Sequence, residues 1–147
     1  MNKNKRIWLA LVFMLIFKSF AFAESNLPVC LTIAGEAGGE GYKGMYAVAC
    51  VINNRAKIQR KTFNQVVATQ FYGKDTKYAR IALQTQKKTI LAIVDKLEKG
   101  LIEDITGGAT HFENVERFGM PQYIKKNPKR WVVTCKIKHH TFFKEKR

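Results

Sequence analysis

Two carboxyl groups near the start of the chain have the spacing and surroundings of a general acid–base site. Glu36 lies at the end of an apolar stretch, with one residue between it and Gly38-Gly39, and Glu40 follows four residues after Glu36. If a helical turn continued, the two side chains would lie about 5–6 Å apart. Apolar neighbours and a second carboxylate both raise the pKa of a carboxyl group, which suits proton donation to a glycosidic bond. A glutamate beside glycines is also common as a plain surface residue.

Histidine and cysteine side chains offer two other kinds of chemistry. His111, His139 and His140 are of the type that binds zinc. The sequence has no H-E-x-x-H motif, however, and adjacent histidines of a strand point to opposite faces. We therefore expect no metal site and no cofactor. A Cys–His nucleophile pair is possible by composition, but Cys30 and Cys50 lie in apolar helical patterns typical of core residues.

The elements that must position these side chains are helices first and strands last. Four segments have the apolar periodicity of helices: 26–37, 42–57, 62–70 and 77–99. Asn26 or Ser25 is expected to cap the first, Thr62 caps the third, and Gly100 ends the last. The alternating, β-branched segment 131–143 predicts one or two strands, after a less regular region. The pattern predicts an α+β fold, mainly helical, with a small antiparallel β-sheet near the C-terminus.

The first 23 residues have the pattern of a secretory signal peptide. Basic residues precede an apolar run of 11 residues over 7–17, and Ala21-Phe22-Ala23 supplies the small residues that signal peptidase accepts. An uncut membrane anchor would need a longer apolar run. We expect cleavage after Ala23, export to the periplasm or the extracellular cell wall, and a single domain over residues 24–147.

Composition excludes several classes of protein. Of the 147 residues, 46% are hydrophobic and 12% aromatic, which argues against a disordered chain. Three cysteines are too few for a disulfide-rich scaffold. They permit three pairings, among which the sequence does not choose. The net charge is +15, and residues 24–147 keep +11 because the signal segment carries four basic residues and no acid. Such a surface attracts polyanions, which for an exported protein are wall polymers or a membrane surface rather than nucleic acid.

Several sequence motifs follow one another along the chain. The longest is Gly35-Glu36-Ala37-Gly38-Gly39-Glu40-Gly41, continued by G-M-Y-A-V-A-C-V-I-N-N-R over 44–55. The later ones are Gln70-Phe71, Gly108-Ala109-Thr110-His111-Phe112, Pro121-Gln122-Tyr123, and Ile137 with His140, Phe142 and Phe143. Together, over about residues 27–143, they resemble those of the spore-cortex-lytic, SleB-type cell wall hydrolases. The chain differs from the family pattern at Tyr123, Lys138 and Phe143, where the family has Trp, Gly and Tyr.

The resemblance implies a lysozyme-like fold related to lytic transglycosylases, with peptidoglycan glycan strands as the partner. It implies that Glu36 protonates the oxygen between N-acetylmuramic acid and N-acetylglucosamine. The same carboxylate then takes the proton from the muramic C6 hydroxyl, which attacks C1 and forms a 1,6-anhydro product. No second catalytic carboxylate, metal or cofactor is required. Substrate contacts are expected from other positions of the motifs: Glu40, Gln70, Phe71, His111, Phe112, Tyr123, His140 and Phe142.

Three other functions fit the same residues. A muramidase would use water with the same Glu36, whereas an N-acetylmuramoyl-alanine amidase would cut the peptide from muramic acid. A non-catalytic cationic module would bind wall polymers or a membrane surface, and its binding would fall steeply with salt. In each case we expect a monomer.

Overall fold

The computed structural model of the chain describes Trp8 and residues 26–146. The signal peptide predicted over 1–23 therefore lies outside the described residues, apart from Trp8. The described residues contain no helix whose length and hydropathy would suit it to span a bilayer.

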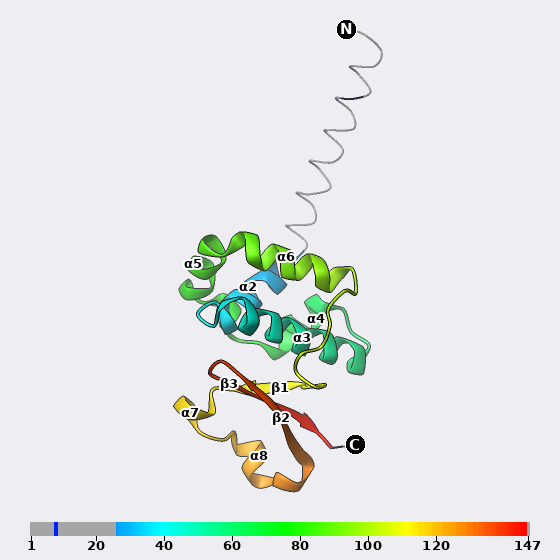
Figure 1. Cartoon of the computed structure of the whole chain (residues 1–147), viewed down its shortest axis with the longest axis vertical. Helices are drawn as coiled ribbons and strands as arrows, with labels where there is room; N and C mark the ends of the chain where they lie inside the picture. The colour runs from blue at the N-terminus through cyan, green and yellow to red at the C-terminus, as the bar shows by residue number, and fades with distance from the viewer. Residues whose placement is uncertain (1–7, 9–25, 147) are drawn as a thin grey trace.

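The N-terminal half of the described chain is helical (Figure 1). Its helices are α2 (Leu27–Ala37), α3 (Gly41–Gln59), α4 (Phe63–Gln70), α5 (Lys77–Thr85) and α6 (Lys87–Glu98), with a 3₁₀ turn η1 (Gly73–Asp75) before α5. The first three confirm the predicted segments. Thr62 caps α4 in a capping box, since its hydroxyl accepts a hydrogen bond from the Gln65 N–H at 3.2 Å. Asn26 occupies the N-cap position of α2, but its side chain makes no capping hydrogen bond.

The prediction of one helix over 77–99 is wrong. The helix is interrupted at Gln86, whose φ of −120° and ψ of 20° separate α5 from α6. The side-chain amide of Gln86 donates a hydrogen bond to the carbonyl of Gly38, just beyond α2. The bend allows both α5 and α6 to pack against α2. Gly100, with φ of +68°, follows the end of α6 as predicted.

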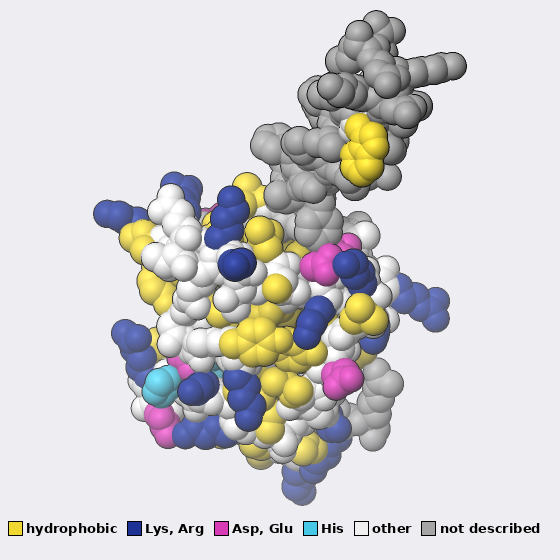
Figure 2. Space-filling view, turned by 45° about the horizontal axis from the view of Figure 1, so that its top comes forward, with side chains coloured by type: hydrophobic (Ala, Val, Ile, Leu, Met, Phe, Trp, Pro, Cys, Tyr) yellow, Lys and Arg dark blue, Asp and Glu magenta, His cyan; other side chains and the backbone are white. Residues whose placement is uncertain are grey.

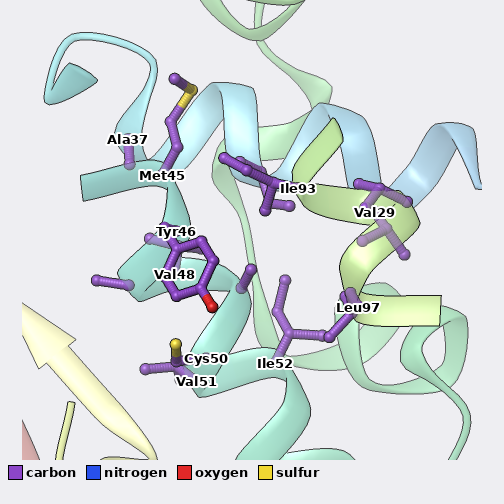
Figure 3. Close-up of a cluster of buried hydrophobic side chains, with 14 of the residues drawn as sticks. Val29, Ala37, Met45, Tyr46, Val48, Cys50, Val51, Ile52, Ile93 and Leu97 are labelled. Atoms are coloured by element: carbon purple, nitrogen blue, oxygen red, sulfur yellow. The ribbon is translucent and has the colours of Figure 1, made fainter. Parts of the chain in front are cut away.

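The hydrophobic core lies among α2, α3 and α6. Val48 and Ile52 of α3 are fully buried, as are Val29 of α2 and Ile93 of α6. Figure 3 shows these side chains converging from the three helices. Burial of one such side chain stabilises a fold by about 1.5–3 kcal/mol. The core therefore fixes the end of α2, which carries Glu36, relative to the start of α3, which Glu40 precedes.

The C-terminal part of the chain forms a small antiparallel sheet. Its strands are β1 (His111–Glu113), β2 (Trp131–Ile137) and β3 (His140–Glu145), in the order β1-β3-β2. The segment predicted as one or two strands thus forms β2 and β3, while β1 was not predicted. Between β1 and β2 lie α7 (Val115–Phe118), α8 (Gln122–Lys126) and the 3₁₀ turn η2 (Pro128–Arg130). The predicted fold class, mainly helical with a small antiparallel sheet near the C-terminus, is confirmed.

A tight turn at Lys138 and His139 joins β2 to β3. Lys138 has a φ of +55°, in the left-handed region that favours glycine. This conformation gives a physical reason why the family that the sequence resembles has Gly at this place. The turn brings His139 next to the α2–α3 connection, where it meets Glu40.

Candidate active site

Glu36 lies in a hollow between the helices and the sheet, which we call the Glu36 hollow. Its volume is about 400 Å³. Side chains from α2, α3, α4, β1, α7 and β3 line it, among them Glu36, Arg55, Gln70, Phe112, Arg117 and His140. Glu36 is partly buried, near the end of α2. Its Oε1 accepts a hydrogen bond from the Gly73 N–H at 3.0 Å, whereas its Oε2 has no hydrogen-bond partner among the described residues.

A close approach of two glycines positions the Glu36 carboxyl. A Cβ on Gly35 would lie 2.2 Å from the carbonyl oxygen of Gly73, and a Cβ on Gly73 would lie 2.9 Å from Glu36 Oε1. Only the absence of both side chains allows η1 to approach α2 so closely. The Gly73 N–H can therefore reach the carboxyl group and fix its orientation.

Arg55 places a positive charge beside this carboxyl. Its guanidinium donates to the carbonyls of Thr110 and Gln70 and lies 4.7 Å from the centre of the Phe71 ring. Burial lowers the pKa of Arg55, and attraction to Glu36 opposes part of that shift. The guanidinium still stays protonated at any physiological pH. Arg55 thus links α3, α4 and the segment before β1 around the hollow.

Glu40 anchors the β2–β3 turn to the helices. Its Oε2 accepts the backbone N–H of His139 at 3.0 Å, and its Oε1 lies 3.0 Å from His139 Nδ1. Only 14% of the Glu40 side chain is exposed. Burial alone would raise the pKa of Glu40, but the His139 hydrogen bonds and the charges of His140 and His139 outweigh it and hold the pKa below its usual range. Glu40 is therefore an ionised, fully engaged carboxylate rather than a proton donor.

This anchor predicts a pH-dependent stability. Because the folded-state pKa of Glu40 is lowered, its ionised form stabilises the fold above the ordinary value of 4.5, and this contribution is lost as the pH falls through the folded-state pKa. We expect E40Q to lower the free energy of unfolding by about 1 kcal/mol at pH 7, and by much less at pH 3. Urea unfolding at both pH values measures this.

The matched control is E98Q, since Glu98 is exposed at the end of α6. It should leave stability nearly unchanged at both pH values. If E40Q lowered the free energy of unfolding equally at pH 3 and pH 7, the stabilising role given to the Glu40 charge would be contradicted.

The two histidines of the sheet lie in different surroundings. His140 lines the Glu36 hollow, is only 9% exposed, and its Nδ1 has no hydrogen-bond partner among the described residues. Burial lowers its pKa, although Glu40 and Glu36 oppose the shift. His111 packs edge-on against Trp131 with ring centres 4.7 Å apart. Burial, with the charge of Arg55, lowers its pKa to about 4. Both rings are neutral at pH 7.

The structure brings together only some of the predicted substrate contacts. Those that line the Glu36 hollow are Glu40, Gln70, Phe71, Phe112 and His140. His111 lies instead in a neighbouring hollow, next to Tyr123. Phe142 is fully buried in the core and leaves no ring face for a sugar. Phe71 is 3% exposed and its ring lies under Arg55.

Sequence reasoning missed several residues of the Glu36 hollow. Three of them are exposed aromatics, Tyr72, Tyr78 and Phe118, of which Tyr72 is 85% exposed and Phe118 67%. Glu113 of β1 also lines the hollow, and its Oε1 accepts the Asn114 N–H at 2.9 Å. Tyr72 directly follows the Gln70-Phe71 motif, and this is the one feature of the sequence that could have indicated a place in the site. Phe118 and Glu113 lie in the region that the sequence left irregular.

The described residues offer neither a metal site nor a reactive thiol. No group of three His, Cys, Asp or Glu side chains there has the arrangement of a metal site. Cys30, Cys50 and Cys135 are free thiols. Burial raises the pKa of Cys30 and of Cys50 to about 11. Both thiols are therefore protonated at neutral pH and are poor nucleophiles.

Comparison with known proteins places the chain in a family. A family model described as cell wall hydrolase matches residues 39–143, which is most of the chain. The match begins just after Glu36, so it does not include that residue. No curated protein and no solved structure shows significant similarity to the chain. By the extent of the family match, the chain belongs to the cell wall hydrolase family.

Proposed function

We propose that the protein cleaves the β-1,4 linkage between N-acetylmuramic acid and N-acetylglucosamine in peptidoglycan, with Glu36 as acid and then base. Family membership supports peptidoglycan as the substrate. One observation carries the choice of residue: Glu36 directs a carboxyl into the hollow with one oxygen held by Gly73 and the other without a partner among the described residues. Glu40, by contrast, has both oxygens on His139.

The proposed reaction needs a single carboxyl group. Protonated Glu36 gives its proton to the linking oxygen as the bond from that oxygen to the muramic C1 breaks. The muramic C6 hydroxyl attacks C1 and returns its proton to the carboxylate, so Glu36 is regenerated and a 1,6-anhydro ring is formed. The role of the Gly73 N–H is to orient the carboxyl throughout. The signal peptide predicted over 1–23 would bring the enzyme to this substrate outside the cytoplasm.

Analysis of the reaction products tests this proposal. Purified peptidoglycan is digested with the protein that comprises residues 24–147, and the masses of the released fragments are measured by mass spectrometry. We expect muropeptides that are lighter by one water than the products of hydrolysis. An amidase would leave the glycan strands intact, and a non-catalytic module would release no fragments.

One observation favours hydrolysis as a second candidate function. Glu113 lines the same hollow as Glu36, but from β1 on the sheet side. Many glycosidases that use water place a second carboxylate across the substrate from the acid. Glu113 is the residue that could serve as the base in such a reaction.

The E113Q variant separates the two reactions. Because the proposed reaction needs only Glu36, we expect E113Q to keep its rate within about tenfold of the wild type and to form the same anhydro product. If Glu113 were the general base, the rate would fall by about 100- to 10,000-fold. Release of reducing ends from peptidoglycan measures the rate, and loss of that magnitude would favour the muramidase.

The exposed aromatics of the hollow are expected to bind sugar rings. Tyr72 presents most of its ring to solvent at the edge of the hollow. An aromatic contact contributes about 0.5–1.5 kcal/mol beyond burial. Y72A should therefore raise KM by about two- to tenfold with little change in kcat. Y72F keeps the ring and should behave as the wild type. An equal effect of Y72A and Y72F would contradict stacking.

A further inference from the structure

A second hollow adjoins the Glu36 hollow, and we call it the basic hollow. Its volume is about 810 Å³, and it shares Arg55 and Gln70 with the first. Gln70 forms part of the boundary, because it exchanges two hydrogen bonds with Gln59 at 2.6 and 3.1 Å. The two hollows therefore lie side by side with Arg55 and Gln70 between them, so a ligand long enough to pass over these two residues would contact both.

The two hollows differ in charge. Lys57, Lys144 and Lys146 line the basic hollow together with the shared Arg55. Among the described residues that line it, the one carboxylate is Glu145, which forms an ion pair with Arg130 outside the hollow. In the Glu36 hollow the balance is reversed, with the three carboxylates Glu36, Glu40 and Glu113 against Arg55 and Arg117. The positive charge is thus concentrated beside the proposed reaction site and not within it.

The ammonium groups of the basic hollow are open to an anion. Lys57 and Lys146 are exposed and have no acidic partner among the described residues. Lys144 is exposed, and its Nζ donates to the carbonyl of Gly107 at 3.1 Å, which leaves its charge uncompensated. Basic side chains are numerous elsewhere on the surface too (Figure 2). What distinguishes these three is that they line one cavity that shares Arg55 and Gln70 with the Glu36 hollow.

This inference rests on the proposed function and adds a part of the substrate to it. The sugars of a peptidoglycan strand are uncharged, and the negative charge near the scissile linkage lies on the carboxylates of the peptide attached to muramic acid. Lysine ammonium groups bind carboxylates through charge-assisted hydrogen bonds. We propose that the basic hollow binds the carboxylates of the peptide stem of the muramic acid residue held in or next to the Glu36 hollow.

Equilibrium binding of two soluble fragments tests this. Isothermal titration calorimetry with the whole protein compares a disaccharide–tetrapeptide from peptidoglycan with a peptide-free fragment, the same disaccharide with its lactyl carboxyl blocked as a neutral methyl amide. We expect K57Q/K144Q/K146Q to weaken binding of the peptide-bearing fragment by roughly tenfold, and to leave binding of the peptide-free fragment unchanged. The wild-type preference should also shrink at high salt.

A control variant with the same change in charge is K87Q/K88Q/K125Q, whose lysines are exposed and line neither hollow. It should keep the wild-type preference. The proposal is overturned if the wild type binds both fragments equally, or if the control variant loses as much affinity for the peptide-bearing fragment as K57Q/K144Q/K146Q does. It is also overturned if a polyol-phosphate wall polymer binds the basic hollow more tightly than the peptide-bearing fragment does. Because the readout is binding, a wild type that shows the preference but cleaves no glycan would overturn the proposed function alone.

Discussion

E36Q is expected to fold like the wild type and to clear no peptidoglycan. The amide keeps the size of the carboxyl, and its oxygen can still accept the Gly73 N–H that now binds Oε1. An amide neither donates a proton to a leaving oxygen nor takes one back, so both proposed steps fail. Loss of general acid–base catalysis costs about 100- to 10,000-fold in rate. Turbidity clearing of a peptidoglycan suspension measures it, with thermal unfolding as the test of folding.

The control for this experiment is again E98Q, a glutamate on the surface of α6. E98Q should retain full activity, and E36Q should still sediment with insoluble peptidoglycan. Full lytic activity of E36Q would rule out Glu36 as the proton donor. In that case Glu113, the other carboxylate of the hollow without a bond to a histidine, would be the next candidate.

Local patterns predicted most of the helical part, because helices and their caps depend on residues close in sequence. The Thr62 cap with Gln65 and the end of α6 at Gly100 are of this kind. The break at Gln86 could not be predicted, since the group that binds its side chain is the carbonyl of Gly38, which belongs to another helix terminus. Strand β1 has only three residues and depends on pairing with β3.

In the candidate site, too, the features that depend on neighbouring residues were predictable, and those that depend on residues far along the chain were not. The apolar helix and glycines around Glu36 made it a candidate, and the resemblance of its motif to cell wall hydrolases made it the predicted acid. The role of Glu40 depends on His139, 99 residues further along the chain, so no local pattern indicated that it holds the β2–β3 turn. Phe142 has the alternation of a strand residue, but only the packing of the sheet on the helices shows that its ring is inside.

The contact between Gly35 and Gly73 gives the second large expected effect. In an isolated helix, Gly35→Ala would be favourable by about 1 kcal/mol. Here the new Cβ would lie 2.2 Å from a backbone oxygen, which cannot rotate away as a side chain can. Overpacking of this kind costs about 1–3 kcal/mol or more. We expect G35A to lower the free energy of unfolding by about 2 kcal/mol and the rate of glycan cleavage by about 100-fold, since misplacement by about 1 Å has that effect on catalysis.

Gly73→Ala separates the effect on Glu36 from the effect on stability. Its Cβ would meet Glu36 Oε1 at 2.9 Å, at the end of a flexible side chain that can shift, and the backbone carbonyl carbon of Gly35 at 3.1 Å, a milder approach than the 2.2 Å of G35A. G73A should therefore lose less stability than G35A yet lose at least tenfold in kcat. G100A is the control, because Gly100 has a positive φ but no atom within 4 Å of its would-be Cβ. It should lose some stability and no activity. If G73A kept full activity, orientation of the Glu36 carboxyl by the Gly73 N–H would not matter for the reaction, and Glu36 would have to act from another position.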